Sequence, residues 1–397
     1  MCKYLKAQAC AGFFRVIRSS FEQSARVRFI PRRLGSNHLI PAGAALIFGM
    51  LMAGVANAAD VPQHQVSLSD VQLQEGTLRV HFIDVGPGMA ALIQTPSGYN
   101  IFIDGGKGKS HMLRKYLHKF VPQGGVILMA IVTHPDFDHY KGMLNVFHDY
   151  EVSWFLHPGY HSDELGVTWG KVLARATEEG SEIYAPLEDW VRVCEYEVLD
   201  EVGEGPEDDV TITYLNVDKM PPNSDPLTGR RFSEAERRNN ASLVFKIEYG
   251  TTSFLFTGDI NGRNKHHTMP DDDLEIDSEE AELVRRHEFD PACSLQADVM
   301  QAPHHGSNGS CSLPFVRAVD PSWVVFTAGH EHNHPHPGSW RRVKSEVSET
   351  HMLRTDIGDH MPEHRVSRED KEKEGDDSFI FVSDGETLNR LMWVKTD

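Results

Sequence analysis

The chain has 397 residues, which is enough for one substantial domain or two small ones. Its apolar fraction of 40% suits a globular core and excludes disorder throughout. The formal net charge of −19 disfavours nucleic acid and anionic membranes as partners unless a local basic patch intervenes.

The first 58 residues differ in composition from the rest. They carry eight Lys or Arg against the single acid Glu22, then an uncharged apolar stretch over 39–55 and the small residues 56–58. This order is typical of a secretory signal cleaved after Ala58. An uncleaved anchor facing the periplasm stays open, because the stretch lies at the lower limit for spanning a bilayer. We therefore expect a secreted or periplasmic protein whose remaining 31 bases and 57 acids give a net charge of −26.

Residues 59–75 are predicted to be a polar linker, and residues 76–348 the folded domain. The domain begins with three alternating apolar runs at 78–85, 90–94 and 100–104, which predict a meander. Asp84 and Asp104 end two of these strands before glycines. We expect both to accept backbone hydrogen bonds in the turns, and secondarily to support metal ligands.

The middle of the domain alternates helices and strands. We expect helices at 110–120, capped by Ser110, at 142–147 and at 168–179, with strands at 126–132 and 152–156. Two insertions rich in acidic residues, near 200–236 and 261–292, interrupt the pattern. The first is predicted to carry loops, with periodicity only over 210–217, and the second a short helix at 281–287.

Regular structure resumes after each insertion. The predicted elements are a hairpin from 242–249 and 253–257, strands at 297–302 and 323–327, and helices at 314–319 and 340–347. Residues 349–397 form the last segment. It is predicted to be charged and loose up to 377 and to end in a hairpin of 378–383 and 391–394 at a sheet edge.

Four predicted strand ends deliver metal-ligand residues. They are His134, Asp136, Asp138 and His139 after the first strand, Asp259 after the second, His304 and His305 after the third, and the group from His330 to His336 after the fourth. Each alone has an ordinary explanation, such as a turn aspartate or a surface histidine pair. Their joint occurrence indicates one divalent-cation site at the edge where the strand ends meet.

These residues resemble the HxHxDH signature of the metallo-β-lactamase superfamily in its HxDxDH form. The flanking segments are similar to the hydrolase domain of ComEC-type competence proteins. In chain order they are Asp84–Gly88, Ile103–Gly106, Asn239–Val244, Thr257–Asp259, Pro303–Ser307 and His334–Pro335. The match runs over about residues 78–345 in the family's order. Because no polytopic channel accompanies it, the chain resembles a stand-alone secreted relative.

The resemblance implies an α/β (α+β) fold, the four-layer αββα metallo-β-lactamase sandwich, with two divalent metal ions, zinc or manganese, at one edge. By position, His134 and Asp136 would hold the first ion, and Asp138 and His139 the second. Asp259 would bridge the two ions. His304 or His305, together with His334, would complete the ligand shells.

Two such ions can share a hydroxide and clamp both oxygens of a phosphoester, so no Ser or Cys nucleophile is needed. Asp138, His139 and Asp259 are the predicted catalytic residues, with Asp138 also orienting the hydroxide. Asp136 stands where the family often has a histidine, and an oxygen ligand there shifts the preference of the first ion toward harder metals such as manganese. The family also has a separate histidine ligand between the signature and Asp259. This sequence has no clear counterpart of it, and His157 is the candidate.

The leading interpretation is a metal-dependent phosphodiester hydrolase, including a nuclease. One alternative is a lactone, thioester or β-lactam hydrolase of the same fold, and another is a degenerate metal-binding or interaction module. The acidic surface makes DNA a less favourable substrate than a small-molecule phosphodiester. Affinity for DNA would need the metals and a patch formed by Arg230, Arg231, Arg237 and Arg238, which more simply form a solvated loop. A cleaved signal leaves no stable membrane partner.

Three cysteines, Cys194, Cys293 and Cys311, follow the signal segment. They contain no CxxC pair, so a zinc ribbon is not supported. An oxidising compartment would allow one disulfide among these three cysteines. Cys293 and Cys311 are the pair closer in sequence.

Overall fold

The structure is a computed structural model of the whole chain. It describes residues 64–107, 111–162, 165–203, 205, 208–218, 220–224, 229–262, 278–329, 334–355 and 377–396. The predicted signal, Ser110, His330 and His332 lie outside these residues, as do 263–277 and 356–376. All the described residues belong to one compact unit, Asn57–Asp397.

The first sheet contains nine of the described strands, in the order β1-β16-β15-β2-β3-β4-β5-β6-β7. Their bounds are β1 Gln65–Ser67, β2 Leu78–Phe82, β3 Ala91–Gln94, β4 Asn100–Ile103, β5 Val126–Ile131, β6 Glu151–Leu156, β7 Glu182–Tyr184, β15 Ser378–Ser383 and β16 Leu388–Lys395. The predicted meander is the antiparallel run β2-β3-β4, and β4 to β7 pair in parallel. Parallel pairing brings the carboxyl ends of β4 and β5 to one edge.

The second sheet contains seven of the described strands, in the order β14-β13-β12-β11-β10-β9-β8. Their bounds are β8 Tyr196–Asp200, β9 Val210–Asn216, β10 Val244–Tyr249, β11 Thr252–Phe256, β12 Val299–Gln301, β13 Trp323–Phe326 and β14 Met352–Arg354. The predicted hairpin is the antiparallel pair β10-β11. The strands β11 to β14 are parallel, so their carboxyl ends share an edge.

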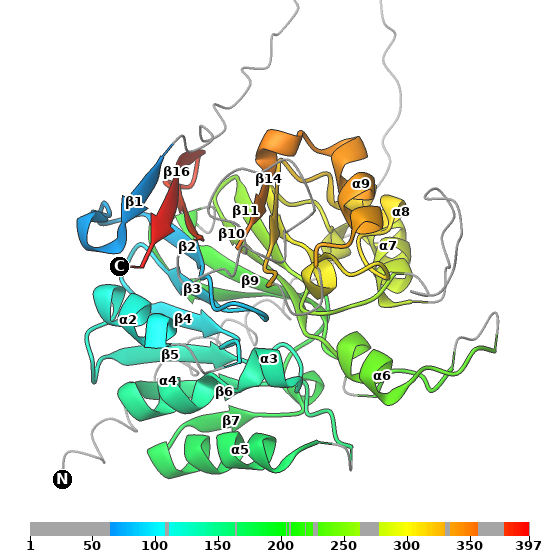
Figure 1. Cartoon of the computed structure of the whole chain (residues 1–397), viewed down its shortest axis with the longest axis horizontal. Helices are drawn as coiled ribbons and strands as arrows, with labels where there is room; N and C mark the ends of the chain where they lie inside the picture. The colour runs from blue at the N-terminus through cyan, green and yellow to red at the C-terminus, as the bar shows by residue number, and fades with distance from the viewer. Residues whose placement is uncertain are drawn as a thin grey trace, which may run out of the picture. The chain divides into compact units, whose positions relative to one another are not determined.

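Helices cover the outer face of each sheet (Figure 1). On the first sheet they are α2 His111–Phe120, α4 Met143–Asp149 and α5 Val167–Glu179, and on the second α7 Glu279–Phe289, α8 Leu313–Val319 and α9 Pro337–Glu346. Two short helices, α3 Phe137–Tyr140 and α6 Glu234–Asn240, complete the α-helices of the described residues. The two sheets and their outer helices make the predicted αββα sandwich.

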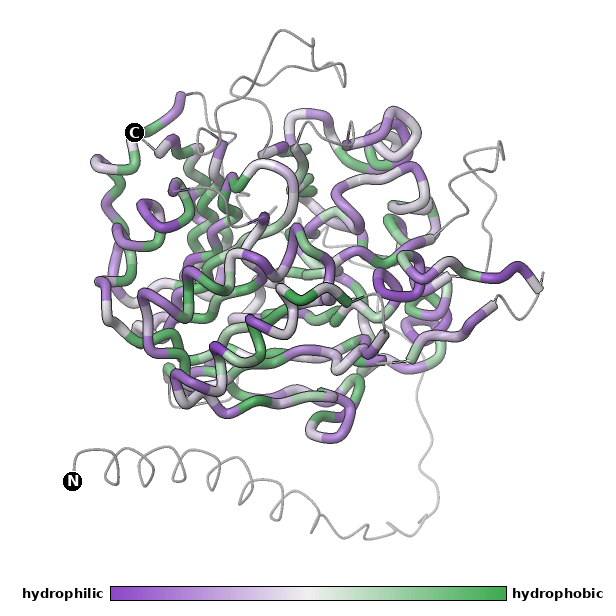
Figure 2. Tube along the Cα trace, turned by 60° about the horizontal axis from the view of Figure 1, so that its bottom comes forward, coloured by the Kyte–Doolittle hydropathy of each residue, from purple (hydrophilic) through white to green (hydrophobic). Residues whose placement is uncertain are grey.

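Aromatic side chains hold the inner faces of the two sheets together. The ring of Phe82 on β2 stacks on Phe256 of β11 with centroids 5.7 Å apart. Phe381 on β15 contacts Phe254 and Trp323 of the second sheet at 6.1 and 5.9 Å. Burial of such rings supplies much of the hydrophobic stabilisation of a sandwich core. Hydrophobic residues are concentrated along the strands, whereas the outer helices contain both hydrophobic and hydrophilic residues (Figure 2).

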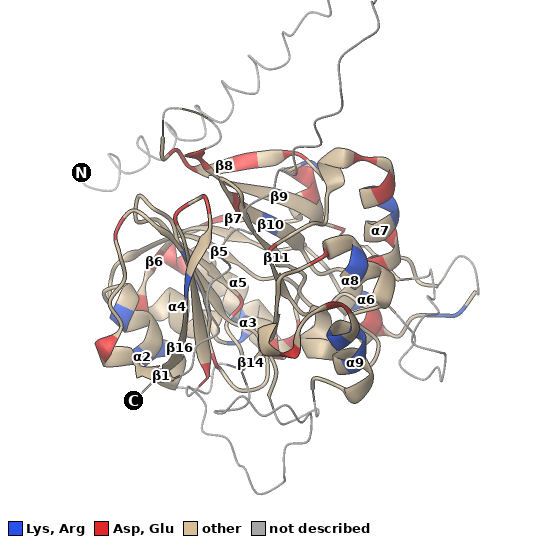
Figure 3. Ribbon diagram, turned by 90° about the horizontal axis from the view of Figure 1, so that it is seen from above, with Lys and Arg blue, Asp and Glu red and all other residues tan. Residues whose placement is uncertain are grey.

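Charged side chains lie mainly on the outer helices and loops (Figure 3). Some of them are nevertheless buried, and Asp149 at the end of α4 is 3% exposed. Its carboxylate accepts two hydrogen bonds of 2.6 Å from Arg114 of α2. This ion pair fixes α2 to α4 above the first sheet, since a bidentate arginine constrains both distance and orientation.

Several short elements lie where the sequence predicts none. Part of the predicted linker forms β1, which pairs in parallel with β16, and the predicted loose segment contains β14. The last hairpin lies inside the first sheet, because β15 also pairs with β2. Helix α6 begins in the first insertion and continues past its predicted end at 236, and it starts with a capping box between Ser233 and Glu236. These elements are three to eight residues long and depend on distant partners, which local periodicity does not reveal.

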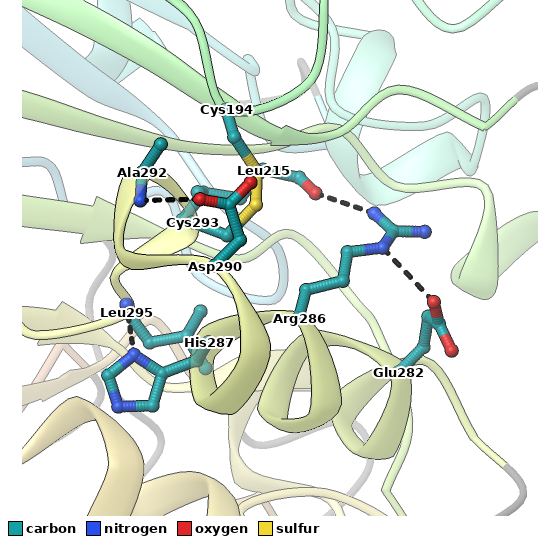
Figure 4. The surroundings of a disulfide bond; sticks show 9 residues. All are labelled: Cys194, Leu215, Glu282, Arg286, His287, Asp290, Ala292, Cys293 and Leu295. Carbon is teal, nitrogen blue, oxygen red and sulfur yellow. Dashed lines mark hydrogen bonds and ion pairs between the residues drawn. A yellow bond between two sulfur atoms is a disulfide. The ribbon is translucent and has the colours of Figure 1, made fainter.

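The disulfide joins Cys194 to Cys293, and Cys311 is a free, buried thiol. The pairing expected from proximity in sequence is therefore wrong. Cys194 precedes β8 and Cys293 follows α7, yet their Cα atoms are 4.8 Å apart. Figure 4 shows the bond beside α7, where Arg286 links the helix to the Leu215 carbonyl at 3.0 Å. The disulfide ties the β8 edge of the second sheet to the segment after α7.

Candidate metal centre

The carboxyl ends of strands from both sheets converge on one cluster of ligand-type side chains. β5 leads to His134 and His139, β11 to Asp259, and β12 to His304 and His305. Among the described residues, two groups could each hold a metal ion. One contains His134, His139 and Asp259, and the other Asp138, His139 and His305, with ligand atoms within 4.8 Å of one another.

Asp104 fixes the protonation of the signature imidazoles. Its carboxylate accepts hydrogen bonds from Thr133 N at 2.8 Å, Thr133 Oγ1 at 2.7 Å and His139 Nδ1 at 2.7 Å. Because His139 donates from Nδ1, the neutral ring keeps its lone pair on Nε2. Burial opposes a charge on this ring, but Asp259 and Asp104 outweigh it and raise the pKa of His139 well above the usual range, so the site attracts a cation at Nε2, either a proton or a metal ion. A carboxylate behind an imidazole is the usual support of a metal-binding histidine. Asp104 thus supports His139, whereas Asp84 accepts a hydrogen bond from Gly86 N in its own turn.

His305 points a second ring nitrogen at the same place. Its Nδ1 donates to the Thr327 carbonyl at 2.6 Å, so in the neutral ring the lone pair lies on Nε2. Burial opposes a charge on this ring, but Asp259 outweighs it and raises the pKa of His305. The Nε2 atoms of His139 and His305 are 3.1 Å apart. Nitrogens this close need one positive charge between them, which is a proton in the metal-free site or a metal ion bound to both. The separation is close to the roughly 3.4 Å edge of a tetrahedron of nitrogen ligands around zinc.

Asp259 contributes the negative charge between these imidazoles. Its Oδ1 lies 3.2 Å from His139 Nε2, and its Oδ2 lies 3.4 Å from His305 Nε2 and 3.8 Å from His134 Nε2. Burial opposes ionisation of this side chain, but the surrounding imidazoles outweigh it and hold its pKa well below the usual range. A carboxylate whose two oxygens face different histidines can bind one ion or bridge two.

His134 has a nitrogen that lacks a protein partner. Its Nδ1 lies 3.1 Å from Thr133 Oγ1, whose proton goes to Asp104. The ring is fully buried, and its Nε2 makes no hydrogen bond among the described residues. Burial lowers the pKa of His134 well below the usual range, so the neutral ring offers a lone pair. A buried, neutral and unpaired imidazole nitrogen beside a carboxylate fits a metal ligand.

Asp138 faces the cluster from the open side. Its Oδ2 lies 3.8 Å from His305 Nε2, and its side chain is 22% exposed. Burial raises its pKa, but His139 and His305 outweigh this effect and lower the pKa below the usual value. The ionised carboxylate can therefore accept a hydrogen bond from a water molecule or bind a cation.

Asp136 lies apart from both candidate groups. Its Oδ1 accepts a hydrogen bond from Arg238 Nε of α6, and its Oδ2 lies 3.8 Å from His134 Nε2. The Asn239 amide, with its nitrogen toward Asp136, donates to Oδ2 at 3.1 Å. Protein donors thus engage both oxygens of Asp136 in this arrangement, and its role as a ligand of the first ion stays a prediction.

The remaining predicted histidines surround the cluster. His304 Nδ1 lies 2.9 Å from Asn261 Oδ1, and its Nε2 lies 3.8 Å from Asp259 Oδ2. The ring of His334 is 5.7 Å from that of His304 and 6.1 Å from that of His305. His157 packs among aromatic rings 5.1 to 5.4 Å away, and its Nδ1 accepts from Gly159 N. It behaves as a core histidine rather than the missing ligand.

A cavity of about 560 Å³ opens onto this cluster. Polar side chains dominate its wall. The lining residues are Asp136, Asp138, Ser233, Ala235, Glu236, Asn239, Asp259, Asn261, His304, His305, Ser307, Asn308, Gly309, His334 and His336. A hollow with few apolar side chains and many hydrogen-bonding groups suits a small polar ligand.

The Asp84–Gly88 turn supports the signature loop from behind. Gly88 has φ +116°, and a Cβ placed on it would lie 2.1 Å from the Asp138 backbone oxygen. Met89 is fully buried, and its N–H donates to the same oxygen at 3.3 Å. The glycine is required because any side chain would displace the backbone of Asp138. This loop therefore positions a ligand residue.

Sequence reasoning missed the contributions of α6 and of residue 261 to the site. Arg238 and Asn239 hold Asp136, and Asn261 holds His304. The capping box at Ser233 and Glu236 was a local signal for α6. Nothing local indicates that Arg238 contacts a residue 102 positions away.

Comparisons with known proteins agree with this architecture. Among curated proteins, ComE operon protein 3 of Bacillus subtilis (strain 168) is 25% identical over 295 residues, covering 70% of this chain and 32% of that protein. Competence protein ComA of Neisseria gonorrhoeae is 27% identical over 119 residues, covering 30% of this chain and 14% of that protein. The chain thus spans about a third or less of the length of these relatives.

Solved structures resemble the chain only at low identity and low TM-score. The metallo-beta-lactamase fold protein YhfI from Bacillus subtilis is 11% identical with a TM-score of 0.38, covering 68% of this chain and 94% of that chain. Human tRNase Z, short form, is 12% identical with a TM-score of 0.35, covering 68% and 95%. The model of the metallo-beta-lactamase superfamily matches residues 83–330. The chain therefore belongs to the metallo-beta-lactamase superfamily and resembles its ComEC-type competence relatives.

Proposed function

We propose that the chain is a metal-dependent hydrolase of phosphodiesters. The observation that carries the proposal is the pair of imidazole Nε2 atoms of His139 and His305, 3.1 Å apart and flanked by Asp259. This donor set of imidazole and carboxylate fits zinc or manganese. A bound divalent ion would supply Lewis acidity toward the ester oxygen and activate water.

The protein side chains have separable roles in this reaction. Asp104 holds His139 with its Nε2 toward the site, and the Thr327 carbonyl holds His305 in the same way. Asp138 lies at the cavity wall as an ionised carboxylate, where it can accept a proton from an attacking water or orient it. His304 and His334 line the cavity and can donate hydrogen bonds to a phosphate oxygen.

The cavity wall favours a phosphodiester over a β-lactam or lactone. Its lining offers hydroxyl, amide and imidazole groups from Ser233, Ser307, Asn308 and His336, and the apolar side chain of Ala235 is an exception among the lining residues. Apolar atoms of these side chains also contribute to the wall, so the number of hydrogen-bonding groups, rather than a lack of apolar surface, favours the phosphodiester. A phosphodiester presents oxygens that these donors can satisfy.

Hydrolysis of bis(p-nitrophenyl) phosphate by the protein with added Mn²⁺ or Zn²⁺ tests the proposal. We expect turnover that falls at least about a hundredfold in Asp138→Asn, as for loss of a general base. Nitrocefin and a simple lactone serve as comparison substrates. Turnover of the phosphodiester equal to that of Asp138→Asn would refute the proposal, and preferential acyl hydrolysis would favour the lactone or β-lactam alternative.

We further propose that the protein works in an oxidising compartment, outside the cytoplasm. The Cys194–Cys293 disulfide supports this location, because such bonds persist where thiols are not kept reduced. No helix in the described part of the chain is long and apolar enough to cross a membrane. A labelled thiol assay of protein isolated from the producing cell, without reductant, tests this. One titratable thiol per denatured chain is expected once residues 1–58 are removed, and three would contradict it.

We propose a small phosphodiester rather than DNA as the substrate. Three of the four arginines in the predicted basic patch pair with acids: Arg230 with Glu236, Arg237 with Glu234, and Arg238 with Asp136. Paired arginines contribute little to phosphate binding along a strand. A hydrolysis rate on single-stranded DNA that exceeds the rate on the small substrate and falls steeply with salt would contradict this assignment.

A further inference from the structure

The two candidate groups in the metal centre compete for one nitrogen. Both contain His139, and both use its Nε2 because Asp104 takes the proton of Nδ1. One lone pair on nitrogen binds one metal ion. His139 Nε2 lies 3.1 Å from His305 Nε2, whereas His134 reaches the cluster through Asp259 at 3.8 Å. The tighter position is therefore the one between Asp138, His139, Asp259 and His305.

The other position, at His134, is short of ligands. It keeps His134 Nε2 and one oxygen of Asp259, 3.8 Å apart. His304 Nε2 also lies 3.8 Å from Asp259 Oδ2, so it is the other imidazole nitrogen near this position. The remaining carboxylate is Asp136, whose Oδ2 lies 3.8 Å from His134 Nε2. A cation at this position needs Asp136 to supply both a ligand and negative charge.

Arg238 already provides a positive charge at Asp136. The last turn of α6 carries it, and the capping box at Ser233 and Glu236 fixes the start of that helix. Its Nε donates to Asp136 Oδ1, and its side chain is 17% exposed. The Asn239 amide occupies Oδ2. A guanidinium so close to the His134 position repels a divalent ion and competes for the same carboxylate.

We propose that Arg238 controls the metal content of the site. The protein holds one divalent ion tightly, between Asp138, His139, Asp259 and His305. The His134 position accepts a second ion only when Arg238 leaves Asp136. Arg238 is thus a positioning residue that substitutes for the second cation. This inference rests on the proposed metal-dependent function only in requiring an ion at the site.

Metal binding measured without substrate tests the proposal. Chelator-treated protein is titrated with Zn²⁺ or Mn²⁺ by calorimetry, and the metal retained after gel filtration is counted by elemental analysis. We expect about one ion retained per chain in the wild type, with a weaker second binding event. In Arg238→Gln the second event should strengthen by about tenfold or more, because the competing charge is gone. Retention should then approach two ions.

Arg237→Gln is the matched control. Arg237 is the neighbouring residue on α6, pairs with Glu234 and packs over the Tyr160 ring. Its loss perturbs the same helix without removing a donor from Asp136, so retention should stay at about one ion.

Asp136→Asn provides a second test that does not depend on the folding of an arginine variant. The tightly held ion should bind within about twofold of the wild type, because Asp136 is not its ligand, and binding at the His134 position should weaken further. A tenfold loss of affinity for the tightly held ion in Asp136→Asn would overturn the proposal. So would two tightly retained ions in the wild type, or unchanged binding in a folded Arg238→Gln. Because no turnover is measured, these outcomes are independent of the phosphodiesterase assay.

Discussion

Asp104→Asn should separate the folding of the site from its ability to bind metal. The replacement keeps the size of the side chain but changes one acceptor oxygen into a donor. Asp104 receives three hydrogen bonds, from Thr133 N, Thr133 Oγ1 and His139 Nδ1, all between 2.7 and 2.8 Å. An amide can accept the first of these. Its NH₂ group, placed at Oδ2, would face the two remaining donors.

His139 then has one satisfactory response, which is to move its proton. If Nδ1 becomes the acceptor of the new amide hydrogen bond, Nε2 carries the proton and cannot bind a metal ion. Loss of an outer carboxylate partner typically costs 10- to 100-fold in metal affinity. That corresponds to about 1.4–2.7 kcal/mol. We expect the same range here, because Asp104 is fully buried and water cannot replace it.

Competition with a chromophoric chelator measures the metal affinity, and thermal melting with and without metal measures the folding. Asp298→Asn is the control. The Asp298 carboxylate also accepts two hydrogen bonds, from Ser253 N and Oγ at 2.8 and 3.0 Å, and lies before β12 rather than at the site. It should lower stability without changing metal affinity. Wild-type metal affinity in a folded Asp104→Asn variant would refute the tautomer argument.

Three further outcomes are expected. Replacing both Cys194 and Cys293 by serine should lower the free energy of unfolding by about 2–4 kcal/mol, below the roughly 4.7 kcal/mol that chain entropy allows for a loop of about 100 residues. Urea unfolding measures this, and identical midpoints with and without reductant in the wild type would contradict it. Burial alone would raise the pKa of Asp149, but hydrogen bonds led by that from Arg114 lower it from 3.8 to about 2. Its folded pKa is depressed, so the stabilisation is present above pH 4 and is lost as the pH falls toward 2. Asp149→Asn should therefore cost about 1–2 kcal/mol at pH 6, discounted for the partly exposed Arg114, and only a small part of this near pH 2, where half of the native carboxyl groups are protonated. Unfolding curves that differ equally at both pH values would refute this. The melting temperature should rise with the logarithm of the free metal concentration and should fall when a chelator removes the metal. A melting temperature insensitive to metal would contradict an ion at the site.

The longer elements of the fold could be predicted because each carries its own pattern. The strands β5, β6 and β10 and the helix α5 each bury a periodic or continuous apolar set, which the sequence displays locally. The strands β1 and β14 have three residues each and exist because of β16 and β13. Helix α6 consists of charged and polar residues around Ala235, so it lacks an apolar stripe. Only its capping box was visible in the sequence.

The convergence of these candidate ligands at one place could be predicted for a related reason. Each follows a buried parallel strand, and parallel strands bring their ends to a shared edge. The disulfide was not, since Cys194 and Cys293 are 99 positions apart and their separation of 4.8 Å is set by the docking of α7 beside the second sheet. Separation in sequence is a weak guide where loops are long, because loop closure costs grow slowly with length.

The proposed division of the candidate ligands between two ion positions depends on the tertiary structure. The signature spacing presents His134, Asp136, Asp138 and His139 as equivalent donors. Contacts from distant segments make them different. Asp104 turns one His139 nitrogen toward the cluster, and Arg238 holds Asp136. Two proteins with the same signature can therefore bind different numbers of ions if the residue opposite the first carboxylate differs. The charge carried by position 238 of α6 is the variable to test in relatives that share HxDxDH.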